Sequence, residues 1–350
     1  MTSAKVNDGT VSDVKLSLQD FELGEVLGEG SYAQVIEARH RKSGFRYALK
    51  VVDKRHVLRQ NKQQYVMSEK AILSRLDHPG IVRLFGTFQD EISLYFVLEL
   101  AESGELFQQI KSLGKCPEYH IQFCCAEILL ILEYLHSCGI VHRDLKPENL
   151  LLKDGHIKLV DFGSARKLAE GACTASDSNR RNSFVGTAEY VPPELLNNEP
   201  VGFEADLWAF GCVIYQMICG RPPFKGESEY LTFQKIINFE IDYPPYISSI
   251  AKSLIQRLLS KNPEERFGSG FESLKAHPFF HGIVFEDLFT QPAPCWTCSS
   301  HELDTGNGIR RPSKNPDDTE RARKVNINLL TTAAQRNNLN SPIPQGDSRN

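Results

Sequence analysis

The sequence predicts an α+β fold with two lobes: a small β-rich lobe that carries one helix, and a larger lobe made mainly of α-helices. Strand-like runs bounded by turn residues dominate residues 21–101, and one helical stretch from Gln63 to Leu76 interrupts them before Asp77-His78-Pro79-Gly80. Beyond residue 101, apolar residues recur at helical spacing, as from Ile128 to Leu135. The two patterns occupy separate parts of the chain and therefore predict separate lobes.

The elements of the small lobe follow one another at short intervals. A run at 21–23 leads into a glycine-rich turn, and the later strand-like runs are 34–39, 47–52, 81–88 and 94–100. We place this lobe at residues 21–101 and the larger lobe at 102–290. Residues 1–20 and 291–350 are mostly polar, so we expect a disordered N-terminal extension and a disordered C-terminal tail.

The composition argues against several classes of protein. With 41% hydrophobic and 24% charged residues, the 350-residue chain has the make-up of a globular protein, and its net charge of −4 gives no electrostatic reason to expect nucleic acid as a partner. Its apolar stretches are too short or too interrupted to span a bilayer. Residues 1–20 lack the apolar core of a secretory signal, so we expect a cytoplasmic protein.

The nine cysteines should then be reduced thiols and not a disulfide framework. Cys295 and Cys298, with His301 nearby, are a weak signal for a redox or zinc site, because no second pair of this spacing accompanies them.

A glycine-rich loop from Gly28 to Val35 lies between two predicted strands, whereas a dinucleotide-binding loop would be followed by a helix. A β-hairpin that closes over nucleotide phosphates fits better, because glycine lets backbone N–H groups approach phosphate oxygens. Taken alone, the loop fits an ordinary hairpin equally well. Ala33 stands where the phosphate-binding pattern has a third glycine.

Lys50 ends an apolar strand, and a buried ammonium requires an anionic partner. Glu69 on the predicted helix is the natural candidate, and the ion pair would orient Lys50 toward the α- and β-phosphates of a nucleotide. A surface lysine whose stem covers the strand is the alternative.

The run from His142 to Asn149 is the most specific pattern, because several functional side chains stand at fixed offsets in one short loop. Asp144 would accept the proton of a substrate hydroxyl, and Lys146 would neutralise charge on the transferred phosphoryl group. Asn149 would coordinate Mg²⁺. A lysine at position 146 is typical of kinases that phosphorylate Ser and Thr.

Asp161-Phe162-Gly163 follows a predicted strand and places a carboxylate where Mg²⁺ must bridge the phosphates. Two further contacts are expected to be structural. Glu194 should pair with Arg266, and Asp206 should hold the backbone of the 142–149 loop from a buried helix.

With these motifs in order, residues 21 to about 285 resemble a eukaryotic protein kinase domain, and Arg266-Phe267-Gly268 and His277-Pro278-Phe279-Phe280 resemble the AGC group. The stretches 54–58, 74–89, 182–190 and 229–236 are similar to the family of 3-phosphoinositide-dependent protein kinase 1. The resemblance implies the bilobal protein kinase fold and an enzyme that transfers phosphate from ATP, with Mg²⁺, to Ser or Thr. Members of that family are upstream activators of other AGC kinases.

The resemblance also implies the site residues. The catalytic residues are Asp144 and Lys146, and the metal ligands are Asn149 and Asp161. The residues expected to bind ATP are Gly28, Gly30, Val35, Ala48, Lys50, Glu69, Glu99, Ala101 and Glu105.

A docking pocket for the hydrophobic motif of substrate kinases is implied on the small lobe. Most AGC kinases fill this pocket with their own C-terminal Phe-x-x-Phe segment, which does not occur between Thr290 and Asn350, so we expect it to receive a partner. The alternative is that its apolar members only pack the helix on the sheet. The pocket residues would be Lys54, Leu58, Val66, Thr87, Gln89 and Leu94.

Ser183 is similar to the activation-loop phosphorylation site of the family, within a stretch that resembles the site phosphorylated on substrates. A phosphate there would accept charge-assisted hydrogen bonds from Arg143 and Arg166. Ser68 stands where the family has a further basic contact, which predicts a weaker coupling between the phosphate and the helix that carries Glu69.

Two alternatives remain: a different AGC or calcium/calmodulin-type Ser/Thr kinase, and a pseudokinase scaffold that binds partners without catalysis. Animal members of the family carry a C-terminal phosphoinositide-binding domain, which we do not expect in residues 291–350. We accordingly do not expect this chain to bind membrane lipid directly, and we do not expect it to bind nucleic acid. We expect a monomer whose partners are protein substrates, AGC kinases that carry a hydrophobic motif.

Overall fold

The structure is a computed structural model that describes residues 16–30, 32–113, 118–168 and 187–294. All of these described residues belong to one compact unit. Residues 1–15 and 295–350, in which we expected disorder, lie outside the described residues, as do Cys295, Cys298 and His301.

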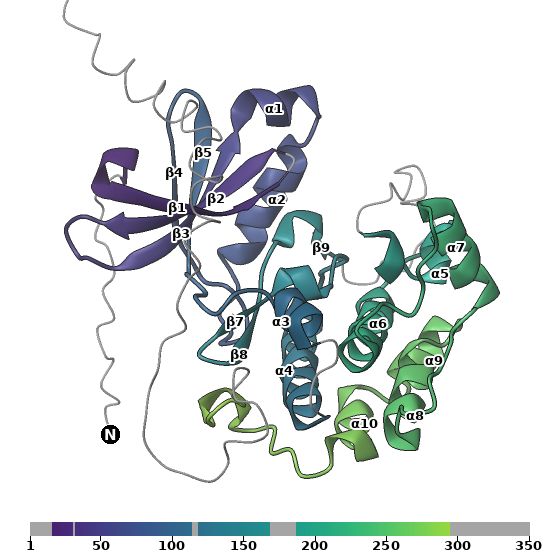
Figure 1. Cartoon of the computed structure of the whole chain (residues 1–350). Coiled ribbons are helices and arrows are strands. Elements are labelled where there is room, and N and C mark those ends of the chain that lie inside the picture. Colours follow the sequence, from purple (N-terminus) through teal and green to yellow (C-terminus); the bar gives the residue numbers. More distant parts are fainter. Residues whose placement is uncertain (1–15, 31, 114–117, 169–186, 295–350) are drawn as a thin grey trace, which may run out of the picture. The chain divides into compact units, whose positions relative to one another are not determined.

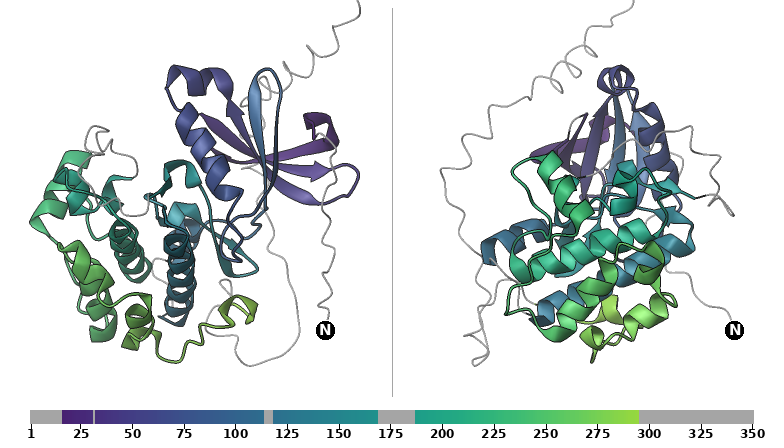
Figure 2. Two further views of the ribbon diagram at one scale, coloured as in Figure 1. Left: turned by 180° about the vertical axis from the view of Figure 1, so that it is seen from behind. Right: turned by 90° about the vertical axis from the view of Figure 1, so that its right-hand side faces the viewer.

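An antiparallel five-stranded sheet forms the small lobe, in the strand order β1-β2-β3-β5-β4 (Figure 1). Two helices follow β3 and precede β4, and the second lies beside the sheet (Figures 1 and 2). The elements are β1 (Phe21–Glu29), β2 (Ala33–His40), β3 (Arg46–Asp53), α1 (Lys54–Arg59), α2 (Gln63–Leu73), β4 (Leu84–Gln89) and β5 (Ser93–Leu98).

The two faces of the sheet bury different sets of side chains, because successive residues of a strand point to opposite faces. Ala48 and Val52 of β3 belong to the large core that includes Val66 of α2. Leu49, between them, belongs to a second cluster with Phe21 and Tyr95, against which residues at the start of the described chain also pack. The sheet therefore presents one face to α2 and the rest of the molecule.

The larger lobe is built mainly of helices around the buried helices α4 and α6 (Figures 1 and 2). Glycine at 211 permits close packing of α6 on α8, because a Cβ there would come within 2.9 Å of Leu258 and Leu259. The helices are α3 (Leu106–Leu113), α4 (Glu118–Ser137), α5 (Pro193–Leu196), α6 (Glu204–Cys219), α7 (Glu229–Asn238), α8 (Ser249–Leu258), α9 (Pro263–Phe267) and α10 (Phe271–Lys275).

Two short antiparallel strand pairs lie between the sheet and these helices, and they hold the loops that carry the sequence motifs. β6 pairs with β9, and β7 pairs with β8. The strands are β6 (Ile140–Val141), β7 (Leu150–Lys153), β8 (His156–Leu159) and β9 (Arg166–Lys167).

The predicted fold class, a β-rich small lobe and a helical larger lobe, is confirmed. The small lobe, however, contains the additional short helix α1, which begins where the Asp53 side chain accepts a hydrogen bond from the His56 N–H. Six residues are too few to show a helical period in the sequence. α2 also ends at Leu73, earlier than Leu76, because the N–H of Arg75 bonds to Ile72 O in a tighter turn.

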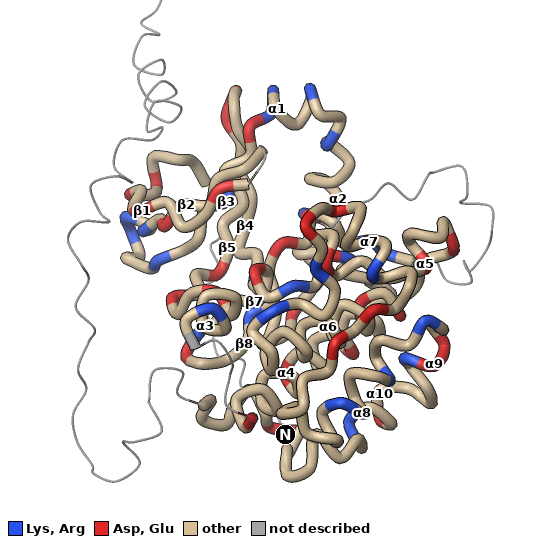
Figure 3. The backbone as a smooth tube through the Cα atoms, turned by 45° about the vertical axis from the view of Figure 1, so that its right-hand side comes forward, with Lys and Arg blue, Asp and Glu red and all other residues tan. Residues whose placement is uncertain are grey.

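Acidic and basic residues are distributed over the whole described part of the chain, and α1 is rich in basic residues (Figure 3). No helix in the described ranges is both long and apolar enough to cross a membrane. The described cysteines form no disulfide with one another.

Candidate active site

Lys50, from the middle strand of the sheet, reaches two carboxylates from different elements. Its ammonium lies 2.6 Å from Oε1 of Glu69 on α2 and 3.4 Å from Oδ1 of Asp161, which follows β8. Burial alone would lower the pKa of Lys50, but the attraction of Glu69 and Asp161 outweighs it and raises that pKa. Lys50 therefore stays a cation, and the predicted pairing with Glu69 is confirmed.

Asp161 is oriented by its own backbone. It adopts a left-handed conformation, with φ of 59°, and its carboxylate accepts a hydrogen bond from the N–H of Gly163. Phe162 is fully buried, with its ring 5.0 Å from that of His142. Burial would raise the pKa of Asp161, but Lys50 first, then His142, lower it, so the half-exposed side chain carries a negative charge.

The 142–149 loop gathers its polar side chains around Asp144. Lys146 Nζ lies 3.0 Å from Asp144 Oδ2, and the amide nitrogen of Asn149 donates to both the main-chain oxygen and Oδ2 of Asp144. Lys146 also donates to the hydroxyl of Thr187 at 2.9 Å. The structure thus brings the predicted residues Asp144, Lys146 and Asn149 together and adds Thr187, which the motif analysis did not single out.

Asp206 of α6 anchors this loop, as predicted. Its fully buried carboxylate accepts hydrogen bonds from the N–H groups of His142 and Arg143, and from Nε2 of His136. Burial would raise the pKa of Asp206, but these donors lower it. The anchor matters because Arg143 has a φ of 66°, an unfavourable conformation for a side chain of its size that the surrounding contacts must hold.

The predicted pair of Glu194 and Arg266 is also confirmed. The two side chains form a bidentate ion pair at 2.7 and 2.8 Å and are almost completely buried, with the guanidinium 5.0 Å from the Trp208 ring. The pair ties α5 to α9 and is structural.

The glycine-rich loop is a hairpin between β1 and β2, closed by a bond from the N–H of Gly30 to the oxygen of Ala33 at 2.7 Å. A Cβ at Gly28 would meet no atom within 4 Å, so packing inside the chain does not require glycine there. Ala48 of β3 belongs to the main core, and Val35 of β2 packs against it.

Tyr32 is a further residue of this region that the motif analysis missed. It is half-buried, and burial followed by the negative charges of Asp161 and Glu69 raises the pKa of its hydroxyl, against the attraction of Lys50. It therefore lies close to the Lys50 cluster, a position that only the folded hairpin reveals.

The segment that connects the two lobes offers unused main-chain groups. Neither the carbonyl oxygen of Glu99 nor the N–H of Ala101 has a hydrogen-bond partner in the described part of the chain. The Glu99 carboxylate forms ion pairs with Lys153 at 2.7 Å and with Lys158 at 2.9 Å. Glu105 begins the next turn and forms an isolated bridge with Leu151.

Arg143 and Arg166 lie on one cavity, which Thr187 also lines. Burial lowers the pKa of Arg143, and the nearby positive charge of Arg166 lowers it further. Nε of Arg143 donates to the oxygen of Ser164 at 2.7 Å. Ser183, the predicted phosphorylation site, lies outside the described residues.

The predicted docking residues are divided between surface and core. Leu58 of α1 is 57% exposed, Leu94 is partly buried, and Val66 is 2% exposed within the core. Lys54 donates to the main-chain oxygen of Asp90, and Gln89 pairs with Leu94 across the β4–β5 ladder. Val66 therefore packs α2 on the sheet, whereas Leu58 is accessible to a partner.

The donor set of Asn149 and Asp161 fits Mg²⁺, which prefers oxygen ligands. The amide nitrogen of Asn149 is committed to Asp144, so its carbonyl oxygen is the atom left for a metal. Asp161 contributes a charged carboxylate that is half exposed.

Comparison with known proteins agrees with this geometry. The protein kinase domain family matches residues 21–280, and the chain belongs to that family. It is 46% identical over 303 residues to 3-phosphoinositide-dependent protein kinase 1 of Arabidopsis thaliana and 47% identical over 281 residues to 3-phosphoinositide-dependent protein kinase 1 of Homo sapiens. It is also 44% identical over 288 residues to Serine/threonine-protein kinase ksg1 of Schizosaccharomyces pombe.

These matches cover 83%, 79% and 79% of this chain but only 62%, 50% and 48% of the three relatives. The chain thus spans about half to three fifths of their length. The predicted resemblance to AGC kinases, and among them to 3-phosphoinositide-dependent protein kinase 1, is confirmed.

Proposed function

We propose that this chain is an ATP-dependent Ser/Thr protein kinase that phosphorylates the activation loop of other AGC kinases. The observation that carries the proposal is the Asp144 carboxylate, which Lys146 and Asn149 hold by hydrogen bonds of 3.0 and 3.1 Å. A fixed carboxylate with an adjacent ammonium suits the transfer of a phosphoryl group to a hydroxyl.

In this proposal Asp144 accepts the proton of the substrate hydroxyl and aligns it for attack. Lys146 balances negative charge on the transferred phosphoryl group, and its bond to Thr187 keeps the ammonium beside Asp144. Lys50 binds the α- and β-phosphates, held in place by Glu69.

The adenine of the nucleotide can be bound by main-chain groups that have no hydrogen-bond partner within the described residues. The free oxygen of Glu99 and the free N–H of Ala101 can bind the edge of adenine, between Val35, Ala48 and the Glu105 turn. Gly28 and Gly30 allow the hairpin backbone to approach the phosphates. Asn149 and Asp161 would hold Mg²⁺, which neutralises phosphate charge when bound.

Activation-loop phosphorylation at Ser183 is part of the proposal. Arg143 and Arg166 concentrate positive charge on one cavity, and a phosphate is the kind of anion that would stabilise this charge. The test is the phosphate content at Ser183, measured by mass spectrometry. If Ser183→Ala kept full activity, this part of the proposal would be wrong.

Substrates would dock through the small lobe. The exposed side chain of Leu58 and the partly buried side chain of Leu94 support the small-lobe pocket that the resemblance to 3-phosphoinositide-dependent protein kinase 1 implies. Leu58→Asp should weaken binding of a labelled peptide that ends in Phe-x-x-Phe, whereas Phe45→Asp, at another exposed apolar position of the same lobe, should not. Equal binding by both variants would contradict docking at this place.

Phosphorylation of a panel of inactive AGC kinases with labelled ATP tests the function as a whole. We expect incorporation at their activation loops, and loss of it in Asp144→Asn. If general Ser/Thr peptides were labelled but the panel was not, the chain would be assigned to another AGC or calcium/calmodulin-type class of kinase. No labelling of any substrate would favour the scaffold.

A further inference from the structure

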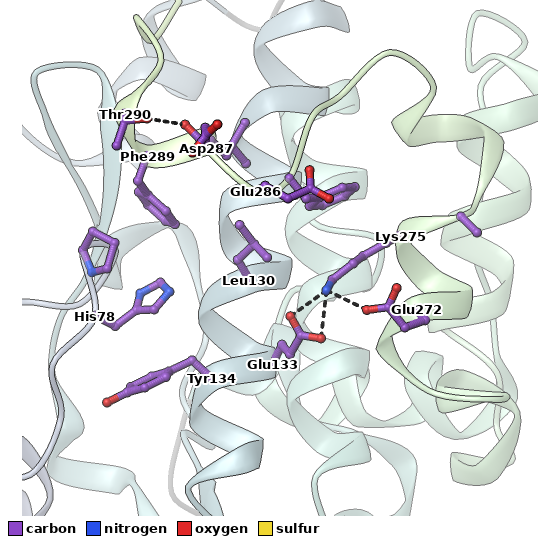
Figure 4. A pocket seen from close by; sticks show the side chains of 14 residues that line it. His78, Leu130, Glu133, Tyr134, Glu272, Lys275, Glu286, Asp287, Phe289 and Thr290 are labelled. Carbon is purple, nitrogen blue, oxygen red and sulfur yellow. Dashed lines mark hydrogen bonds and ion pairs between the residues drawn. The ribbon is translucent and has the colours of Figure 1, made fainter. Parts of the chain in front are cut away.

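A groove of about 780 Å³ opens between helices of the larger lobe and the turn that precedes β4, and it shares no lining residue with the candidate active site (Figure 4). It lies between helix α4, the turn at His78 and Pro79, helix α10, and the segment Phe285–Thr290. The proposed catalytic function uses none of these residues.

One side of the groove is aromatic. The ring of His78 stacks on that of Tyr134 at 4.9 Å, and the edge of Phe289 meets His78 at 5.2 Å. Burial, followed by the positive charge of Lys158, lowers the pKa of His78 to about 4, so this ring is neutral at physiological pH. Leu130 of α4 lies between this wall and the opposite side (Figure 4). The aromatic wall and Leu130 form a surface suited to a bulky apolar side chain.

The opposite side is charged, and its only lysine is already neutralised. Lys275 of α10 lies 2.8 Å from Glu133 of α4 and 2.9 Å from Glu272 (Figure 4). One ammonium is therefore shared by two carboxylates, and the wall keeps a negative charge.

Glu286 and Asp287 add two carboxylates at the rim. Both residues are exposed, and neither carboxylate has a hydrogen bond or ion pair within the described residues. The contacts of Asp287 with Thr290 and Gln291 are made by its main-chain oxygen. With His78 neutral, four carboxylates and one ammonium leave the lining with a net charge of −3.

We propose that this groove binds a linear segment of a partner protein in which Arg or Lys residues adjoin a bulky apolar side chain. The apolar side chain lies against Tyr134 and Phe289, and the cations pair with Glu286 and Asp287. The charge complementarity selects this occupant, because an acidic membrane or an acidic segment would be repelled by the same carboxylates. The proposal is independent of the proposed catalytic function, since no active-site residue takes part.

The test measures the affinity of the full chain for the fluorescein-labelled peptide Gly-Arg-Lys-Arg-Gly-Leu-Ala-Leu-Gly, which contains no phosphate acceptor. Reversing both rim charges in Glu286→Lys/Asp287→Lys should weaken binding about tenfold or more, which corresponds to about 1.4 kcal/mol. The matched control is Glu91→Lys/Glu227→Lys, which changes the net charge equally at exposed positions outside the groove and should bind like the parent chain.

Two changes of the peptide separate the two halves of the site. Replacing its leucines by glycine should abolish binding, because the aromatic wall then has no apolar side chain to contact. Replacing its basic residues by glutamate should abolish binding through repulsion. Binding should also weaken as salt is added, since the Debye length falls to about 3 Å at 1 M. Intact folding of each variant is checked by its thermal unfolding.

Several results would overturn the proposal. The rim variant and the control could bind equally well, or the parent chain could fail to bind the peptide. If the peptide bound only after Arg321, Arg323 and Lys324 were changed to Gln, the competitor would be a basic segment of the chain itself. If the parent chain sedimented as a dimer that the rim variant dissociated, a second copy would be the occupant. Either result would contradict assignment to a partner protein.

Discussion

The ammonium of Lys50 lies 2.6 Å from the carboxylate of Glu69, and these side chains are only 11% and 2% exposed. The pair joins strand β3 to helix α2 across the main core. An isolated charge at this depth would be costly, so each residue depends on the other. The position of α2 therefore controls the position of the cation expected to bind ATP.

Glu69→Gln removes the charge of this partner while it keeps the side-chain shape. Lys50 should then turn toward Asp161, which is already 3.4 Å away. We expect the kcat/KM for ATP to fall about tenfold or more, equivalent to a barrier about 1.4 kcal/mol higher. Steady-state kinase assays measure it, with the exposed Glu91→Gln as the control. Equal kcat/KM in both variants would count against the orienting role.

Thr187→Val tests one of the residues that the motif analysis did not single out. The change removes the hydroxyl that accepts a hydrogen bond from Lys146, but leaves the 3.0 Å contact of Lys146 with Asp144. A hydrogen bond to a charged group contributes about 1.5–3 kcal/mol, so we expect kcat to fall about tenfold to a hundredfold with the KM for ATP unchanged. Thr187→Ser restores the hydroxyl and should recover most of kcat. If Ser and Val behaved alike, the hydroxyl would have no such role.

Arg266→Met should destabilise the larger lobe strongly. It leaves the carboxylate of Glu194 buried without its partner, and losses of this kind cost about 3–5 kcal/mol in the free energy of unfolding. The measurement is equilibrium unfolding in urea.

The matched control is Arg221→Met, because Arg221 forms an ion pair with Asp242 in which the two side chains are 49% and 73% exposed. An exposed pair of this kind contributes about 1 kcal/mol or less. If the two variants lost similar amounts of the free energy of unfolding, burial would not be what makes the ion pair of Glu194 and Arg266 stabilising.

His156 predicts a pH dependence of stability. Its hydrogen bond to Glu127, at 2.6 Å, raises its pKa against the effect of burial, with smaller contributions from the oxygen of Gln291 and the charge of Asp154. A raised pKa in the folded state means that the stabilisation is fully present below the unfolded pKa of about 6.5 and disappears as the pH rises through the folded pKa.

His156→Gln removes the titration but keeps a donor for Glu127. The parent chain should exceed this variant in the free energy of unfolding at low pH, and the difference should shrink as the pH rises above about 6.5. Urea unfolding across that pH range measures the difference. A difference that stayed constant with pH would show that His156 does not titrate as described.

Much of the active site could be predicted because its residues are close in the sequence. Asp144, Lys146 and Asn149 stand within one loop, so their spacing alone implies that they meet, and the structure brings them within hydrogen-bonding distance. Long-range contacts were predicted only where a chemical need was evident, as for the buried Lys50 and the buried Asp206. Thr187 and Tyr32 carry no such signal, since a hydroxyl at either position fits an ordinary loop.

The sequence by itself determined the fold class and the grouping of Asp144, Lys146 and Asn149 in one loop, because hydrophobic period and local spacing are properties of neighbouring residues. Only the tertiary structure decided which of the predicted docking residues are accessible: it buried Val66 in the core and left Leu58 on the surface. It alone also assembled the groove, because His78, Glu133, Lys275 and Glu286 come from distant segments. Side chains so far apart in the chain meet only when the helices pack, and their summed charge then becomes a property of one surface.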